Sequence, residues 1–140
     1  MREWARVTTT ELAAMDPGDA VAVLPLGATE QHGPHLPLST DTDIAEGLLA
    51  AAAGELRGGA SVLRLPTLAV GASTEHGGFP GTLSVPAETL AATLRGIGAG
   101  IAAAGVRRLV LLSAHGGNRA AMDIAALDLP VGYESEAGLL

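Results

Sequence analysis

The sequence predicts an α/β fold in three layers, with helices on both faces of a mainly parallel sheet. Three short apolar runs, at residues 20–26, 61–65 and 107–112, are each followed by a segment with apolar residues at helical spacing. Strands that alternate with helices form parallel sheets through right-handed crossovers, and continuous apolar runs are typical of strands buried on both faces. A chain of 140 residues is long enough for one such domain and short for two.

The first part of the chain predicts a short helix, a central strand and a longer helix. Residues 8–10 resemble a helix start, and Asp-Pro-Gly at 16–18 ends that helix before the strand at 20–26. Ser39 or Thr40 caps the next helix, which continues until the glycines at 58–59. We expect its apolar face to lie on the sheet, and this face consists of Ile44, Leu48, Ala52 and Leu56.

The second part predicts two more strands and two more helices. The strand at 61–65 leads to a loop at 71–82 that is rich in glycine and small polar residues, and loops of this length are usually functional. Ser84 caps a helix that ends at Gly105, and the third strand, 107–112, precedes a last helix at 119–127. The apolar stripe of the helix after Ser84 consists of Leu90, Leu94, Ile97 and Ile101.

The segment 128–140 fits this pattern poorly and offers no fourth strand. A sheet of three strands leaves one edge and much apolar helix surface without a partner. We therefore expect a sheet that is truncated after the third strand and its following helix, with a domain at 1–127 and a divergent tail at 128–140.

Charge and composition exclude several classes of protein. The net charge of −7 and the scattered basic residues argue against nucleic-acid or membrane partners, which need clustered Lys and Arg. The absence of cysteine excludes disulfides, thiolate metal sites and cysteine nucleophiles. The sequence carries no apolar signal core and no apolar stretch of membrane length, so a cytoplasmic enzyme is expected.

Four residues form the strongest candidate site. Glu30, His32 and Asp41 follow the first strand, and His115 follows the third, so a parallel sheet brings all four to one rim. Carboxylates and imidazoles without thiolates favour Zn²⁺, Mn²⁺ or Fe²⁺, with zinc the first choice. Any one of them could be an ordinary surface residue, but four on one rim favour a metal site.

Other polar residues have weaker claims. His35 could orient a ligand or face a substrate, and Asp43 could simply belong to the first turn of the helix. Glu75 and His76 could contact a substrate or transfer a proton as catalytic residues, although a solvated loop explains them equally well. Asn118 could cap the last helix or donate to an oxyanion, and capping is the simpler interpretation. The glycines form neither a dinucleotide-binding nor a Walker motif.

With these residues in view, the chain resembles the creatininase (creatinine amidohydrolase) family. The matching segments are 25–37 (PLGATEQHGPHLP), Thr40-Asp41 with Asp43, Gly71 with Glu75-His76 and Phe79-Pro80-Gly81-Thr82, and 115–118 (HGGN). The resemblance implies a three-layer fold, a two-metal hydrolase of C–N bonds that acts through a metal-bound hydroxide, and often a homohexamer. It also implies that Glu30, His32, Asp41 and His115 are metal ligands, with Asp41 as the bridge.

The chain departs from the family in two respects. Creatininase itself has a further ligating Glu at the position of Gly117, which weakens creatinine as the substrate. Family members also continue beyond this length to a late HGGxxET or HAGxxET motif that completes the site, and this motif is absent. We therefore expect the N-terminal portion of a longer family member.

Two functions follow from the resemblance. One is a metal-dependent amidohydrolase of a cyclic amide, a formamide or a peptide, among which the sequence does not choose. The other is a truncated, catalytically inactive homologue that acts as a binding or assembly partner.

Overall fold

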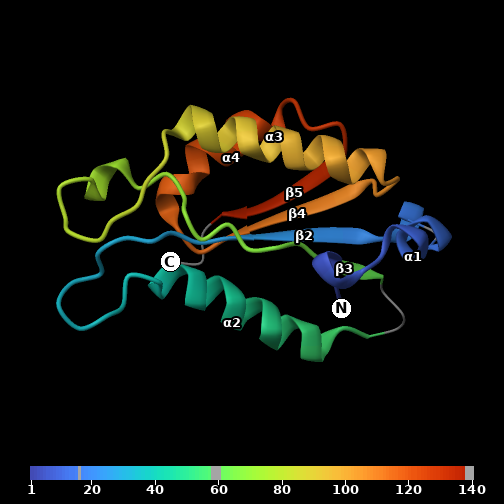
Figure 1. Ribbon diagram of the computed structural model, residues 1–140, viewed down its shortest axis with the longest axis horizontal. Coiled ribbons are helices and arrows are strands. Elements are labelled where there is room, and N and C mark those ends of the chain that lie inside the picture. The colour runs from blue at the N-terminus through green and yellow to red at the C-terminus, as the bar shows by residue number, and fades with distance from the viewer. Residues whose placement is uncertain (16, 58–60, 138–140) are drawn as a thin grey trace.

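The computed structural model describes residues 1–15, 17–57 and 61–137 and has the three-layer α/β architecture that the sequence predicts (Figure 1). The strands of its sheet all run parallel, in the order β1-β3-β2-β4-β5. Their bounds are Arg2–Glu3 (β1), Val21–Leu26 (β2), Val62–Arg64 (β3), Arg108–Ser113 (β4) and Gly132–Ala137 (β5). The helices are Thr9–Ala14 (α1), Thr40–Glu55 (α2), Ala87–Ala103 (α3) and Arg119–Ala126 (α4).

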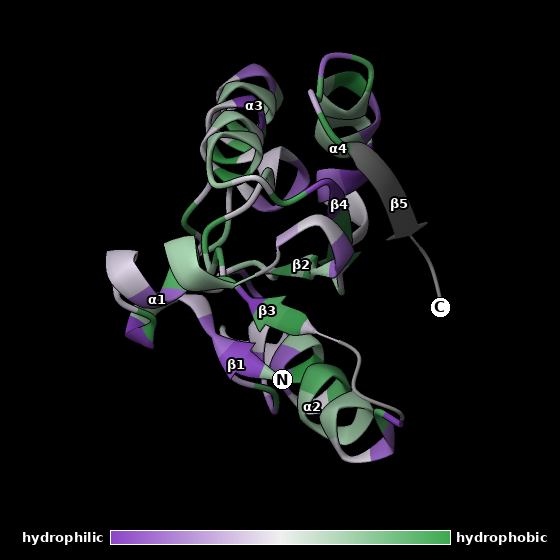
Figure 2. Cartoon of the chain, turned by 90° about the vertical axis from the view of Figure 1, so that its right-hand side faces the viewer, coloured by the Kyte–Doolittle hydropathy of each residue, from purple (hydrophilic) through white to green (hydrophobic). Residues whose placement is uncertain are grey.

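The helices divide between the two faces of the sheet. Helix α2 covers one face, and α3 and α4 lie together on the other, as the two views agree (Figures 1 and 2). The chain passes from β2 to the face of α2, and from the neighbouring strand β4 to the face of α4. Connections that leave adjacent parallel strands toward opposite faces open a crevice at the carboxyl ends of those strands. We refer to the region beyond Leu26 and Ser113, where these two connections diverge, as the crevice.

The core lies mainly between the sheet and α3. Leu24 of β2 and Leu111 of β4 are buried, and they belong to the same cluster as Leu90, Leu94 and Ile101 of α3. The apolar stripe predicted for this helix is thus confirmed. Each such side chain contributes about 1.5–3 kcal/mol when it is fully buried. This packing fixes β2 and β4, the strands that carry the crevice.

The prediction that the sheet has only three strands is wrong at both edges. Strand β5 lies within the tail for which no strand was expected and pairs with β4 from Arg108 to Ser113. Strand β1 adds Arg2 and Glu3 beside β3. An edge strand is held by backbone hydrogen bonds to one neighbour, so its sequence need not be continuously apolar. The apolar pattern therefore missed both.

The predicted orientation of α2 is also wrong. Ile44 and Leu48 are exposed at 39% and 50%, whereas Ala45 and Leu49 are buried. The buried face begins with Asp41 and continues at intervals of four residues. A helix so rich in Ala and Leu carries apolar residues on more than one face, so its sequence leaves the rotation open.

The helix starts are confirmed only in part. Thr8 forms the capping box of α1 with Glu11, as the sequence suggests. Ser39 stands at the N-cap of α2, but its hydroxyl donates to Asp43 instead of capping the backbone. Ser84 is not the cap of α3, because Pro86 occupies that position.

Within the described residues, none of the helices combines the length and apolar composition needed to cross a membrane.

Candidate metal centre

The structure brings the four predicted ligands together in the crevice. Glu30 and His32 lie on the loop after β2, Asp41 lies in the first turn of α2, and His115 follows β4. Glu30, Asp41 and His115 are buried, at 3%, 6% and 7% exposure. Buried carboxylates and imidazoles need partners of opposite charge or hydrogen-bonding partners.

The carboxylate of Asp41 lies between the two histidines. Its Oδ1 is 2.9 Å from His32 Nε2, and its Oδ2 is 3.0 Å from His115 Nδ1. Each oxygen therefore faces a different imidazole. This placement suits a carboxylate that supplies one oxygen to each of two cations.

Backbone carbonyls determine which ring nitrogens carry protons when the rings are neutral. His32 Nδ1 is 3.2 Å from the carbonyl oxygen of Glu30, and His115 Nε2 is 3.0 Å from that of Ala72. A carbonyl can only accept, so these two nitrogens donate. The other nitrogen of each ring then directs a lone pair at Asp41. Lone pair and carboxylate repel each other unless a cation, either a proton or a metal ion, lies between them.

Glu30 places a second carboxylate beside His115. Its Oε1 lies 3.3 Å from His115 Nδ1, and within the described residues its Oε2 is buried without a hydrogen-bond partner. An unpaired buried carboxylate oxygen is costly unless a cation compensates it. Two groups of side chains have ligand atoms within 4.8 Å of one another: Glu30, His32 and Asp41, and Glu30, Glu75 and His115. The residues present thus fit divalent ions.

The surroundings of His32 favour its charged form. Burial lowers the pKa of this imidazole, but the hydrogen bond to the Glu30 carbonyl and the carboxylate of Asp41 outweigh that effect and raise the pKa above its usual value. The position beside Asp41 therefore attracts positive charge.

The loop at 71–82 closes over the crevice. Its 3₁₀ turn, Thr74–His76, brings Glu75 Oε1 to 3.7 Å from His115 Nε2 and His76 Nε2 to 3.5 Å from Glu30 Oε1. Glu75 remains half exposed. Both residues predicted from the loop are therefore beside the centre, whereas their catalytic role stays a prediction.

The amide of Gln31 orients His76. Its Oε1 accepts from the N–H of Gly33, which directs its NH₂ group to His76 Nδ1 at 2.9 Å. His76 Nδ1 therefore accepts, and the neutral ring carries its proton on Nε2, toward Glu30. The role of Gln31 could not be predicted, because a glutamine between Glu30 and His32 carries no signal of its own.

Sequence reasoning also missed Ser73 and misassigned Asn118. Ser73 is fully buried, with its hydroxyl 3.3 Å from His115 Nε2. Asn118 stands at the N-cap of α4 but makes no capping hydrogen bond, and its side chain instead bonds the backbone of Gly27 and Ala72. The sequence signal for a role of Asn118 at the site was its position directly after His115 and two glycines.

Gly117 is a tight point of the site. A Cβ at this position would lie 2.2 Å from the Ala72 carbonyl oxygen, 2.4 Å from His115 Nε2 and 2.6 Å from Glu75 Oε1. The adjacent Gly116 has open space at its Cβ position. The lack of a side chain at Gly117 therefore allows the loop of Glu75 to approach His115.

His35 and Asp43 lie apart from the centre. Both are exposed, and neither belongs to either group of potential ligands. Asp43 accepts a hydrogen bond from Ser39 in the first turn of α2, in agreement with its interpretation as a helix residue.

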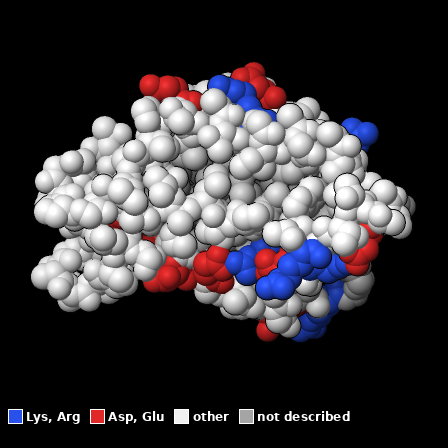
Figure 3. All heavy atoms as spheres, viewed as in Figure 1, with Lys and Arg blue, Asp and Glu red and all other residues white. Residues whose placement is uncertain are grey.

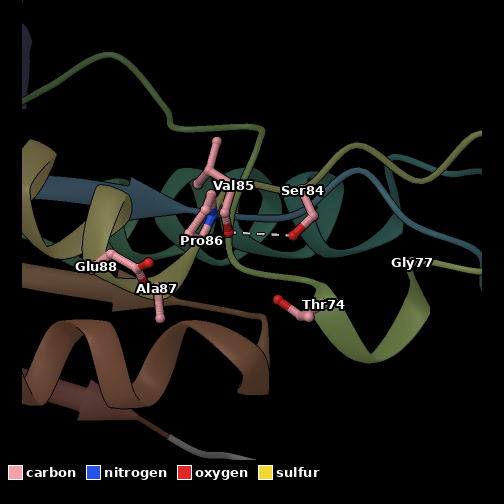
Figure 4. Close-up of a pocket in the computed structure, with 7 residues that line it drawn as sticks. All are labelled: Thr74, Gly77, Ser84, Val85, Pro86, Ala87 and Glu88. Carbon is pink, nitrogen blue, oxygen red and sulfur yellow. Dashed lines mark hydrogen bonds between the residues drawn. The ribbon is translucent and has the colours of Figure 1, made fainter.

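The mouth of the crevice, formed by residues 31–40 and 76–87, carries no acidic residue, lysine or arginine. The end of the molecule formed by these loops is white at the left of Figure 3. A hollow next to it is lined by Thr74, Gly77 and residues 84–88 at the start of α3 (Figure 4). Thr74 is the chain neighbour of Glu75, so this hollow adjoins the segment that covers the centre.

Known proteins resemble this chain in both sequence and fold. The family model described as creatinine amidohydrolase (creatininase) matches residues 5–137. The chain belongs to the creatininase family. Within this family, the mycofactocin precursor peptide peptidase of Mycobacterium tuberculosis is 40% identical over 126 residues, which cover 86% of this chain and 49% of the relative. The creatinine amidohydrolase of Pseudomonas putida is 36% identical over 103 residues, covering 70% and 38%.

The solved creatininase structures have the same fold. A manganese form of creatininase superimposes with a TM-score of 0.80 at 30% identity, over 95% of this chain and 57% of that protein. This chain thus spans about half the length of the curated relatives it matches. The family match extends through β5, beyond Leu127.

Proposed function

We propose that the crevice is the metal centre of an amidohydrolase that cleaves a C–N amide bond, with Glu30, His32, Asp41 and His115 holding two divalent ions. The observation that carries the proposal is the position of Asp41, whose two oxygens each face the unprotonated nitrogen of a different histidine. Zinc is the first candidate because imidazole and carboxylate suit it, and the manganese form of creatininase supports manganese as well.

The roles of the protein groups follow from their positions. When bound, divalent ions lower the pKa of water to about 7 and polarise an amide carbonyl. Asp41 would offer one oxygen beside each histidine, and Glu30 would add negative charge beside His115 to hold the ions. Glu75 is half exposed and close to His115, so its Oε1 can take up a proton and deliver it to the leaving nitrogen. The Nε2 proton of His76 holds the Glu30 carboxylate in place.

A peptide is the proposed substrate class, ahead of creatinine. The M. tuberculosis relative named as a peptide peptidase matches a larger share of this chain, at higher identity, than the creatinine amidohydrolase of P. putida. The mouth also exposes Leu36, Phe79 and Leu83, and such apolar side chains suit an extended substrate better than a small polar ring.

The test is hydrolysis by the purified chain after metal removal and reloading. With zinc or manganese restored, we expect cleavage of a peptide of the mycofactocin precursor type and slower or no cleavage of creatinine. Asp41→Asn should abolish activity, and the exposed His35→Ala, outside both groups of potential ligands, should retain the bound metal. Failure of the reloaded chain to bind any divalent ion would refute the proposal. Metal binding without hydrolysis of either substrate would favour an inactive homologue instead.

A further inference from the structure

The side chain of Asn118 joins the chain segments that carry the metal centre. Its Oδ1 accepts from the backbone N–H of Ala72 at 3.0 Å, and its Nδ2 donates to the carbonyl of Gly27 at 3.1 Å and to Ser113 Oγ at 3.3 Å. The residue is completely buried. Asn118 thus links the ends of β2 and β4 with the loop that follows β3.

Ala72 passes this constraint on to His115. Its N–H is bonded to Asn118, and its carbonyl oxygen accepts the Nε2 proton of His115 at 3.0 Å. Both backbone polar groups of Ala72 are therefore engaged, one by each residue. The N–H and the carbonyl of Ala72 lie in the two peptide planes that meet at its Cα, so Asn118 holds the first plane directly and thereby fixes the position from which the carbonyl is directed at His115.

Two glycines make the arrangement tight. A Cβ on Gly71 would lie 2.3 Å from Asn118 Oδ1, and a Cβ on Gly117 would lie 2.2 Å from the Ala72 carbonyl oxygen. Real Cβ atoms do not approach other atoms so closely. Positions 71 and 117, which flank the Asn118–Ala72–His115 connection, therefore have no space for a side chain.

The proton on Nε2 matters because the two nitrogens of His115 face different surroundings. Nε2 faces the carbonyl of Ala72, whereas Nδ1 lies 3.0 Å from Asp41 Oδ2 and 3.3 Å from Glu30 Oε1. Histidines that bind metals commonly donate their other N–H to a carbonyl or a carboxylate, which fixes the tautomer and the orientation of the ring.

We propose that Asn118 is a positioning residue of the metal centre: by holding Ala72, it keeps the proton of His115 on Nε2 and leaves Nδ1 free for a cation. Asn118 itself contacts neither the cation nor a substrate. The inference rests on the proposed function for the identity of the group at Nδ1, but the place of the ring proton follows from the hydrogen bonds alone.

The experiment compares Asn118→Leu and Asn118→Asp with the control Met122→Ala. Leucine removes the acceptor for the Ala72 N–H, whereas aspartate keeps an acceptor and loses both donated bonds. Met122 is buried in the core of α4, so its truncation destabilises the fold through a cavity without touching the connection. The three variants thus separate positioning from stability.

Three measurements are made on each protein: unfolding in urea, zinc affinity by competition with a chelator, and the ring nitrogen of His115 that carries the proton, by ¹H–¹⁵N NMR of the zinc-loaded chain. For Asn118→Leu we expect zinc binding to weaken roughly 10- to 100-fold, as for other residues that orient metal ligands, with loss of the uniform Nε2–H signal. Asn118→Asp should keep that signal even if it is the less stable variant. Met122→Ala should lose stability and keep both the signal and the zinc affinity.

The outcomes distinguish the inference from the proposed function. If Asn118→Leu binds zinc as tightly as Met122→Ala and keeps the Nε2 proton, the positioning role is refuted while the metal centre stands. If the wild-type chain takes up no zinc, the proposed function fails, and the same NMR comparison on metal-free protein decides the role of Asn118. If Asn118→Leu does not fold, Gly71→Ala, whose Cβ would displace Asn118 Oδ1, replaces it.

Discussion

Replacement of Asp41 by asparagine tests the metal centre most directly, because asparagine keeps the volume of the side chain and removes its charge. The carboxylate lies 2.9 Å from His32 Nε2 and 3.0 Å from His115 Nδ1, so both cation positions lose a ligand at once. Residues that only orient ligands typically account for 10- to 100-fold in metal affinity. A direct ligand should therefore account for more than about 100-fold at each position, or about 2.7 kcal/mol.

Thermal unfolding with and without zinc measures this loss. An ion present at about 100 times its Kd stabilises the folded state by about 2.7 kcal/mol, which corresponds to a rise in Tm of roughly 10 °C for a domain of this size. We expect the wild-type chain and His35→Ala to show this rise, since His35 is exposed and outside both groups of ligands. Asp41→Asn should show almost none. An equal rise, or equal residual zinc, in the two variants would refute the roles assigned here.

Three further predictions test the surroundings of the site. Gly117→Ala should destabilise the chain by about 1–3 kcal/mol and weaken zinc binding, because the new Cβ would overlap three atoms. Gly116→Ala, whose Cβ meets open space, should be close to neutral in both urea unfolding and zinc titration. Similar effects of the two substitutions would contradict the geometry. The pKa of His32 is raised in the fold, so without metal its contribution to stability is complete below its unfolded pKa and is lost as the pH rises through the raised value. The stabilisation by zinc should instead grow over that pH window, because zinc and the proton compete for Nε2 of His32. The test is the urea midpoint of the wild-type chain with and without zinc from roughly pH 5 to 9, with His32→Gln as control. If the midpoints with and without zinc run parallel across this range, the prediction is wrong. Leu49→Ala should cost about 2–5 kcal/mol in urea unfolding and the exposed Leu48→Ala less than about 0.5 kcal/mol, and a reversed order would mean that α2 is rotated.

The location of the site could be predicted from the sequence because it depends on a rule of topology. Apolar runs locate the central strands, and parallel strands bring their carboxyl ends to one rim, so Glu30 and His115 meet although they are far apart in the chain. The rule fails at the edges of the sheet, where β1 and β5 depend on pairing with one neighbour and carry no strong apolar pattern. The topology rule also does not determine the rotation of α2 about its axis, because Ile44 and Ala45 are equally plausible core residues in an apolar helix.

The sequence by itself determined the fold class, the crevice and the residue types that could hold a cation, since these depend on local apolar periodicity and on the order of the elements. Only the tertiary structure decided which nitrogen of His115 is free, that Asp41 lies between two imidazoles, and that Asn118 holds Ala72 instead of capping α4. The physical reason is that hydrogen bonds between distant segments form only after the core has packed the strands together. A local sequence pattern therefore cannot predict the hydrogen-bond partners of a buried side-chain amide such as that of Asn118.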